Sequence, residues 1–307
     1  MSRQEVKINK LIWLHIDQVT EEDTRYLQNR FRFHLLDLKD CLGTTQRPKV
    51  DFYPRYAFFV FHFPYYDEQQ QRIRIHELMV FAGRQYLVTV TNEPLPTLRK
   101  YWNSFVSKSK RAVSYDPLKN NSGYLLYKIL DVMYRQYLPI IDSTGELVTD
   151  LEDKVYTQQD RETVFRLAVA RRQVLTIRRI LEPQVLIVGR LVAAKYTFFS
   201  KDLEVYFDDV HDYLEKALIT VDAYKDTIEG LHETNQSLLT QRTNDTIKTL
   251  TVISVALLPL TVITGYYGMN VVGLPFATHD SGLWIITILL VGLFLGIIGI
   301  ARRQRLM

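Results

Sequence analysis

Two stretches without a charged residue decide the fold: LTVISVALLPLTVITGYY at 250–267 and LWIITILLVGLFLGIIGI at 283–300. Each has 18 residues, which is near the shortest helix that crosses a bilayer core. A buried helix of a soluble protein is usually shorter and keeps a polar stripe, and neither stretch fits that description. We therefore expect transmembrane helices at 250–267 and 283–301, joined by an extracytoplasmic loop at 268–282. The alternative is a buried helical hairpin of a soluble protein.

The flanking charges predict the orientation of this hairpin. Arg242 and Lys248 precede the first span, three arginines lie in the tail at 302–307, and the loop between the spans has no lysine or arginine. The positive-inside rule then places both termini in the cytoplasm. The first ten residues, MSRQEVKINK, are too charged for a secretory signal. We expect an integral membrane protein of a bacterial or archaeal cell (inner or plasma) membrane, with two spans per subunit.

The composition excludes several classes of function. The net charge of +4 comes without a basic stripe, so we expect no nucleic-acid partner. A single cysteine, Cys41, rules out an intrachain disulfide and a cysteine-cluster metal site, and we expect it to pack as a small hydrophobe. The sequence has no glycine-rich phosphate loop, no HExxH and no nucleophile elbow. We therefore expect neither an enzyme nor a prosthetic group.

Residues 1–143 have the pattern of a cytoplasmic α/β domain of the α+β type, a sheet covered by helices. Thr20 followed by Asp23 predicts a capping box at the start of a helix. Apolar alternation predicts strands at 11–17, 71–83 and 84–92, and the continuous apolar run AFFVFHF within 51–66 predicts a buried strand. Helical spacing predicts helices at 20–31, 34–42, 97–108 and within 119–142, the last ending near Pro139.

Residues 144–193 predict a helical pair, with Pro183 expected to break or restart the second helix. Its charged outer residues are either a solvated face with ion pairs or a ligand site. A cytoplasmic stalk helix at 194–249 is expected to pack on the pair. From Leu203 to Leu238 apolar residues recur at steps of four and three, with Asn235 in the one skipped place. This heptad stripe predicts one continuous helix from near residue 202 to Tyr267, roughly 100 Å long.

The opposite face of this helix is mostly polar. It carries Asp209, Asp212, Asp226 and Glu233, and it continues into the first span with Ser254 and Thr261. Hydroxyl groups on one side of a span indicate an aqueous path, or else they simply hydrogen-bond to carbonyls of their own helix. One hairpin cannot enclose a pore, so the aqueous path requires several copies of the chain around it.

The motif Tyr267-Gly268-Met269-Asn270 follows the first span, and Pro259-Leu260-Thr261 lies inside it. In this position the sequence resembles the CorA family of divalent-cation channels over its whole length. The resemblance implies a homopentamer in the lipid membrane whose stalk helices form a funnel. It implies that Gly268, Met269 and Asn270 form the selectivity filter. It also implies pore-lining or gating positions at Asn244, Ile247, Leu250, Ser254, Leu258 and Thr261, although Leu250 lies about one residue off the polar face.

The resemblance further implies regulatory Mg²⁺ between subunits. Asp209 matches such a position, and Asp51 is a candidate partner for it. Asp212, Asp226 and Glu233 are further candidates on the same face. Bound Mg²⁺ would cancel the repulsion between these carboxylates and hold the stalks together, and loss of intracellular Mg²⁺ would open the pore.

The loop after the motif leaves the transported ion open. It reads VVGLPFATHDSG at 271–282 and contains no glutamate, which is similar to the ZntB branch of the family, whose members move Zn²⁺. His279 and Asp280 are either an outer cation site or plain polar loop. Three functions remain: a Mg²⁺ channel that also passes Co²⁺, a proton-coupled Zn²⁺ transporter, and a membrane-anchored regulatory protein that transports nothing.

Overall fold

A computed structural model describes residues 3–43, 46–70, 72–109, 121–157, 161–193, 203–270, 274–275 and 281–303. The chain forms two compact units. The first comprises residues 1–154 and 160–231, and the second comprises residues 155–159 and 232–307.

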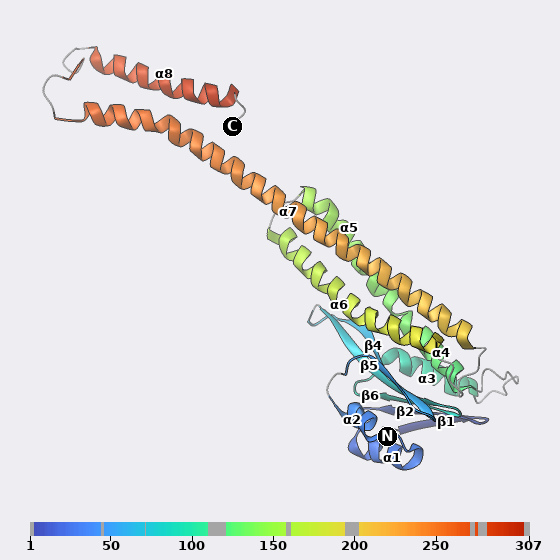
Figure 1. Ribbon diagram of the computed structural model, residues 1–307. Coiled ribbons are helices and arrows are strands. Elements are labelled where there is room, and N and C mark those ends of the chain that lie inside the picture. Colours follow the sequence, from blue (N-terminus) through green and yellow to red (C-terminus); the bar gives the residue numbers. More distant parts are fainter. Residues whose placement is uncertain are drawn as a thin grey trace. The chain divides into compact units, whose positions relative to one another are not determined.

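The first unit is built on a six-stranded sheet with the order β1-β2-β6-β5-β4-β3 (Figure 1). The pairing of β2 with β6 is parallel and every other pairing is antiparallel. The strands are β1 (Arg3–Ile8), β2 (Leu11–Asp17), β3 (Lys49–Phe52), β4 (Tyr56–Asp67), β5 (Arg72–Gly83) and β6 (Tyr86–Thr91).

Two short helices, α1 (Glu21–Phe31) and α2 (Leu35–Leu42), cover one face of this sheet. The predicted capping box of α1 is confirmed, because the Asp23 backbone N–H donates to Thr20 Oγ1 and the Thr20 N–H donates to the Asp23 carboxylate. Cys41 of α2 is fully buried in this core, as expected for a small hydrophobe. Burial raises the pKa of its thiol, so the group stays protonated and unreactive.

The other face is covered by α3 (Pro96–Ser109), α4 (Ser122–Tyr134) and α6 (Arg161–Ala193). The ring of Trp13 meets that of Trp102 edge to face, with centroids 4.5 Å apart. Phe61 and Phe63 pack against Tyr134. A sheet covered on both faces needs apolar residues at successive positions rather than alternate ones. That is why the aromatic run of β4 forms a strand.

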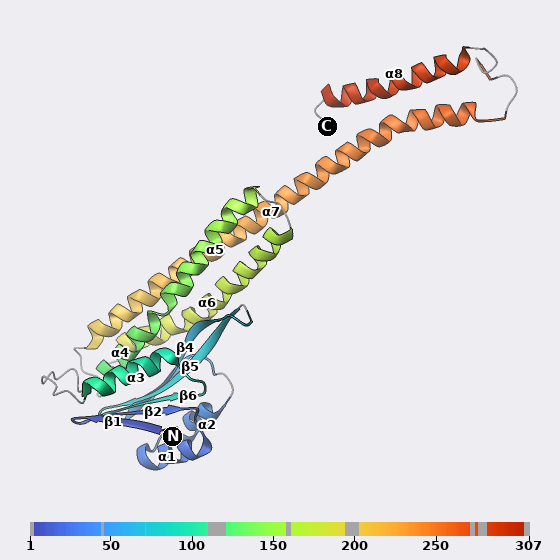
Figure 2. The same ribbon diagram turned by 180° about the vertical axis from the view of Figure 1, so that it is seen from behind.

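In the same unit, α5 (Tyr137–Thr157), α6 and the first part of α7 (Glu204–Tyr267) run side by side (Figures 1 and 2). The heptad stripe of α7 is buried there, as predicted: Leu203, Phe207, Val210, Leu214, Ala217, Val221, Ile228 and Leu231. Asn235, in the skipped place of the stripe, is also buried, at 2% exposure. The prediction of one continuous helix to Tyr267 is confirmed.

Two local predictions were wrong. The helix expected to end near Pro139 ends at Tyr134, and Pro139 stands in the first turn of α5, where a helix has no use for its N–H. Pro183 lies inside α6 without interrupting it. In addition, residues 3–8, for which the sequence predicted no element, form β1. Because α5 begins at Tyr137, it runs across the boundary suggested between residues 143 and 144.

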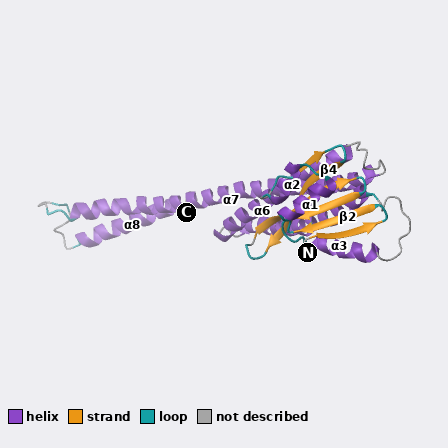
Figure 3. Cartoon of the chain, turned by 90° about the horizontal axis from the view of Figure 1, so that it is seen from below, coloured by secondary structure: helices purple, strands orange, loops and turns teal. Residues whose placement is uncertain are grey.

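The second unit contains the last part of α7 and α8 (Gly282–Arg303). These two helices lie side by side in opposite directions (Figure 3). Both helices contain a stretch long and apolar enough to cross a membrane, and only 6% of each stretch is buried. Such exposed apolar surface requires lipid or another protein to cover it.

Candidate functional site

The membrane part of α7 has a buried side and an open side. Ala256 is fully buried and Val252 is 9% exposed, and the two residues lie on one side of the helix. At 100° per residue, Ser254 lies on the opposite side of the helix. The positions expected to line a pore share that open side, and all of them are exposed in the single chain: Asn244, Ile247, Leu250, Ser254, Leu258 and Thr261.

The hydroxyl groups on the first span are engaged with their own helix. Thr251 Oγ1 donates to the Ile247 carbonyl at 2.8 Å, and Thr261 Oγ1 donates to the Leu257 carbonyl at 3.1 Å. For Thr261, the alternative that the hydroxyl simply hydrogen-bonds to its own helix is therefore correct. It does not conflict with an aqueous path, because Thr261 is exposed and its oxygen keeps free lone pairs.

The Gly268-Met269-Asn270 motif caps the C-terminus of α7. The Gly268 N–H donates to the Thr264 carbonyl at 2.9 Å, and the Met269 N–H donates to the Tyr266 carbonyl at 3.3 Å. A side chain at Gly268 would crowd the Thr264 carbonyl, because its Cβ would lie 3.1 Å from that oxygen. All three motif residues are exposed. The C-terminal end of a long helix carries partial negative charge, which is favourable to a nearby cation. Gly273, His279 and Asp280 lie outside the described residues.

The candidate regulatory acids are exposed along α7 and do not form one cluster within the chain. Asp209 and Glu233 are 24 positions apart on one helix, a separation of about 36 Å. Asp226 accepts from Lys225 Nζ at 3.1 Å. Asp51, the candidate partner of Asp209, lies on β3 and pairs with Lys49 Nζ at 2.7 Å. Any metal held by several of these acids would need ligands from another subunit.

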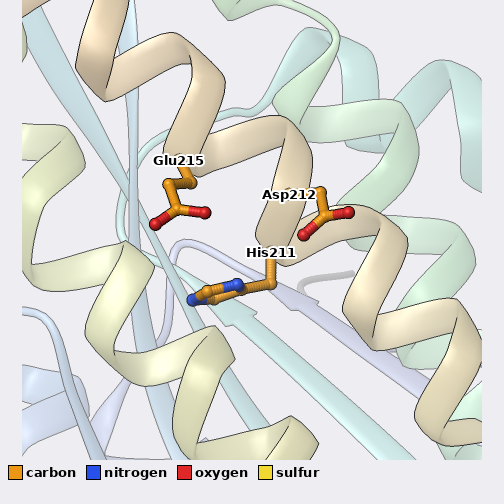
Figure 4. Close-up of side chains that lie close together, drawn as sticks. All are labelled: His211, Asp212 and Glu215. Carbon is orange, nitrogen blue, oxygen red and sulfur yellow. The ribbon is translucent and has the colours of Figure 1, made fainter.

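One cluster on α7 brings three possible metal ligands together, and Asp212 is the only member that the sequence reasoning named. The other two are His211 and Glu215 (Figure 4), and the three ligand atoms all lie within 4.8 Å of one another. Ligands around one Zn²⁺ at its usual bond lengths are at most about 4.2 Å apart, so small side-chain shifts would suffice. The spacing of these three residues at i, i+1 and i+4 on a helix was the sequence signal that could have identified the cluster.

His211 is the least exposed member of this cluster, and its ring lies against α6. A Cβ on Gly189 of α6 would come within 3.1 Å of His211 Nε2, so the imidazole packs closely over this glycine. An imidazole with two carboxylates suits Zn²⁺ or Co²⁺ better than Mg²⁺, which prefers oxygen ligands alone.

A sheet domain leading through one long helix into an apolar hairpin with a Gly-Met-Asn cap defines a class of membrane protein. Residues 9–303 match the family model described as "CorA-like Mg2+ transporter protein". The chain belongs to the CorA family, as its resemblance predicted.

Relatives with different printed functions match almost the whole chain. The "Cobalt/magnesium transport protein CorA" of Thermotoga maritima is 27% identical, over 84% of this chain and 72% of its own length. The "Zinc transport protein ZntB" of Yersinia enterocolitica is 23% identical, over 93% of this chain and 84% of its own length. The complete CorA structure from Methanocaldococcus jannaschii has the same fold, with a TM-score of 0.82 and 21% identity over 98% of this chain and 93% of that one.

Proposed function

We propose that this protein is a divalent-cation transporter of the cell membrane that works as a homopentamer. The observation that carries the proposal is the first span of α7, whose exposed side opposite Ala256 leads to the Gly-Met-Asn cap. Its relatives of known description are cobalt, magnesium and zinc transport proteins. One hairpin cannot surround an ion, so several copies must place this side toward a common axis. Both termini lie in the cytoplasm in this proposal, on the basis of the flanking arginines and lysines.

Mg²⁺ is the proposed principal cargo, with Co²⁺ as a second ion. Mg²⁺ gives up its waters reluctantly, so a site that admits it works best on the hydrated ion. Side-chain and backbone carbonyls at Asn270, added to the negative end of α7, offer that ion hydrogen-bond acceptors. Neither span contains an acid, so an intramembrane carboxylate ring is not needed for selection in this proposal.

Closure by intracellular Mg²⁺ is proposed to act through Asp209, Asp212, Asp226 and Glu233. Each is exposed, and like charges from neighbouring subunits would repel one another without a bridging cation. Bridging Mg²⁺ would favour the closed arrangement by binding it more tightly than the open one.

Zn²⁺ transport is the second candidate function, and it is favoured by a separate observation. His211, Asp212 and Glu215 offer a nitrogen and two oxygens within 4.8 Å of one another, a donor set that Zn²⁺ prefers. The ZntB relative and the loop without glutamate point the same way. This candidate predicts Zn²⁺ flux that responds to a pH gradient.

Flux into liposomes containing the full-length protein tests these functions together. The arms are Mg²⁺, Co²⁺ and Zn²⁺, each with and without a pH gradient. Asn270→Ala should abolish flux of the cargo ion, whereas Asn103→Ala, an exposed asparagine of α3, should leave it unchanged. No flux of any of the three ions would refute transport and favour a membrane-anchored regulatory protein.

The gating part is tested by the double variant Asp209→Asn with Glu233→Gln. It should need a higher internal Mg²⁺ concentration for closure than the wild-type protein. The control is Asp142→Asn with Glu152→Gln, two exposed acids of α5. An unchanged Mg²⁺ dependence of flux in the first variant would contradict the gating proposal while leaving transport intact.

A further inference from the structure

The strand β5 has a free edge over its first half. It pairs with β4 along its whole length, from Arg72 to Gly83, but with β6 only from Met79 to Ala82. Among the described residues, no strand pairs with the other edge of residues 72–75. Backbone N–H and C=O groups that point from such an edge are open to a ligand or a partner.

A cavity of about 420 Å³ lies between this edge and α6. Four arginines line it, two from the strand and two from the helix: Arg72, Arg74, Arg172 and Arg179. Gln173 and Thr176 of α6 add further hydrogen-bonding groups. Residues 172, 176 and 179 follow one face of the helix. Polar and positively charged residues from the strand and from the helix therefore line one hollow.

The positive charge of this cavity is mostly unbalanced. Arg74 is paired with Asp67 at 3.6 Å, which is long for an ion pair. Arg72, Arg172 and Arg179 form no ion pair with an acid of the described residues. By contrast, Arg178 on the same helix donates to Asp222 at 2.6 Å and to Glu182 at 3.0 Å. Arg178 is therefore neutralised by neighbouring acids, whereas most arginines that line the cavity are not.

We infer that this cavity binds a polyphosphate anion of the size of a nucleoside triphosphate. The guanidinium group is planar and donates in pairs, which matches phosphate oxygens. Several linked phosphates are needed to balance several arginines, whereas one phosphate balances about two at neutral pH. The volume lies in the range of small-molecule sites, about 300–1,000 Å³. The half-buried Ile73 and Ile75 offer apolar surface beside the charges. This inference does not depend on the proposed transport function.

The test is binding of ATP to the purified full-length protein by equilibrium dialysis, with divalent cations chelated. Saturable binding is expected, and it should weaken when the salt concentration rises from about 50 mM to about 300 mM, because the contacts are ionic. The double variant Arg172→Ala with Arg179→Ala should raise the dissociation constant at least about tenfold, since two charge-assisted contacts are removed. The control is Arg161→Ala with Arg190→Ala, on the same helix but outside the cavity lining; it should change the constant less than about twofold.

Inorganic triphosphate and inorganic phosphate are the two further arms. If triphosphate binds as tightly as ATP, the inference is supported and the phosphates alone are recognised. If ATP binds more tightly, the inference is supported and the protein also contacts the nucleoside. Three results would overturn the inference: no saturable binding by the wild-type protein, equal binding by the cavity and control variants, or inorganic phosphate binding as tightly as triphosphate. An absence of saturable binding is also expected if acidic side chains of a neighbouring subunit fill the cavity.

Discussion

Gln184 of α6 joins the sheet to the helices through a fully satisfied amide, and its replacement by leucine should destabilise the first unit. Its Oε1 accepts from the His62 backbone N–H at 3.1 Å and from the Tyr134 hydroxyl at 3.2 Å. Its Nε2 donates to the Tyr137 hydroxyl at 2.7 Å and to the Ile180 carbonyl at 2.9 Å. The side chain is fully buried. In Gln184→Leu, the His62 N–H and the Tyr134 hydroxyl lose their acceptor, and the buried site has no water to replace it.

The expected loss follows from those two donors. Each buried unpaired group costs about 1–3 kcal/mol. The added apolar surface of leucine offsets about 1 kcal/mol of the total. A net loss of about 3 kcal/mol lowers the thermal midpoint of a unit of this size by about 6–12 °C, at about 2–4 °C per kcal/mol.

Cys41 is a natural reporter for this measurement, because it is the single cysteine and is fully buried in the core under α1 and α2. The solubilised protein is heated with a maleimide dye that fluoresces on reaction with a thiol. Gln173→Leu, at a half-exposed position on the same helix, serves as the control and should move the midpoint by less than about 2 °C. A midpoint of Gln184→Leu that also stays within this margin would refute the reasoning.

Three further changes should be visible in the same assay. Gly145→Ala should lower the midpoint, because its Cβ would overlap the Tyr224 hydroxyl and overpacking costs about 1–3 kcal/mol; adding Tyr224→Phe should recover part of the loss, and no recovery would contradict this contact. Asn235→Leu should raise the stability, because the buried Asn235 Oδ1 has no hydrogen-bond partner; a lower stability would mean that the amide is satisfied. Burial lowers the pKa of His15, so the folded state binds fewer protons than the unfolded state below the usual value of about 6.5. The stability is therefore complete above that pH and decreases as the pH falls through it; His15→Gln should make the acid-side decrease smaller, and an equal decrease in both proteins would exclude His15 as its source.

The features that depend on local sequence could be predicted. The heptad stripe of α7 identified its buried residues, because period and packing agree over the whole stalk. Thr20 and Asp23 fixed the start of α1, because a capping box involves only neighbours. The Gly-Met-Asn motif placed the chain in its family.

The features that depend on distant partners could not be predicted. Residues 3–8 are mostly polar, and they form β1 by pairing with β2. Arg3 of this strand also pairs with Asp23 at 2.9 Å. Pro183 stays inside α6 because its neighbours Leu181 and Gln184 are fully buried, and this packing outweighs the lost hydrogen bond. The arginine cavity combines a strand and a helix about 100 positions apart. From the sequence, the charged residues of the helix had suggested either a solvated face or a ligand site, with no sign of the strand that completes the cavity.

The threonines of the first span have a consequence for the sign of the ion. Each hydroxyl has one hydrogen, and those of Thr251, Thr261 and Thr264 are already given to carbonyls of the same helix. These hydroxyl oxygens can therefore only accept further hydrogen bonds. Water around a cation turns its hydrogens outward, whereas water around an anion turns its lone pairs outward. At these threonines, the waters around a cation would find acceptors for their hydrogens, whereas the waters around an anion would find no donor. Neutral residues can therefore discriminate charge in this span without a single carboxylate.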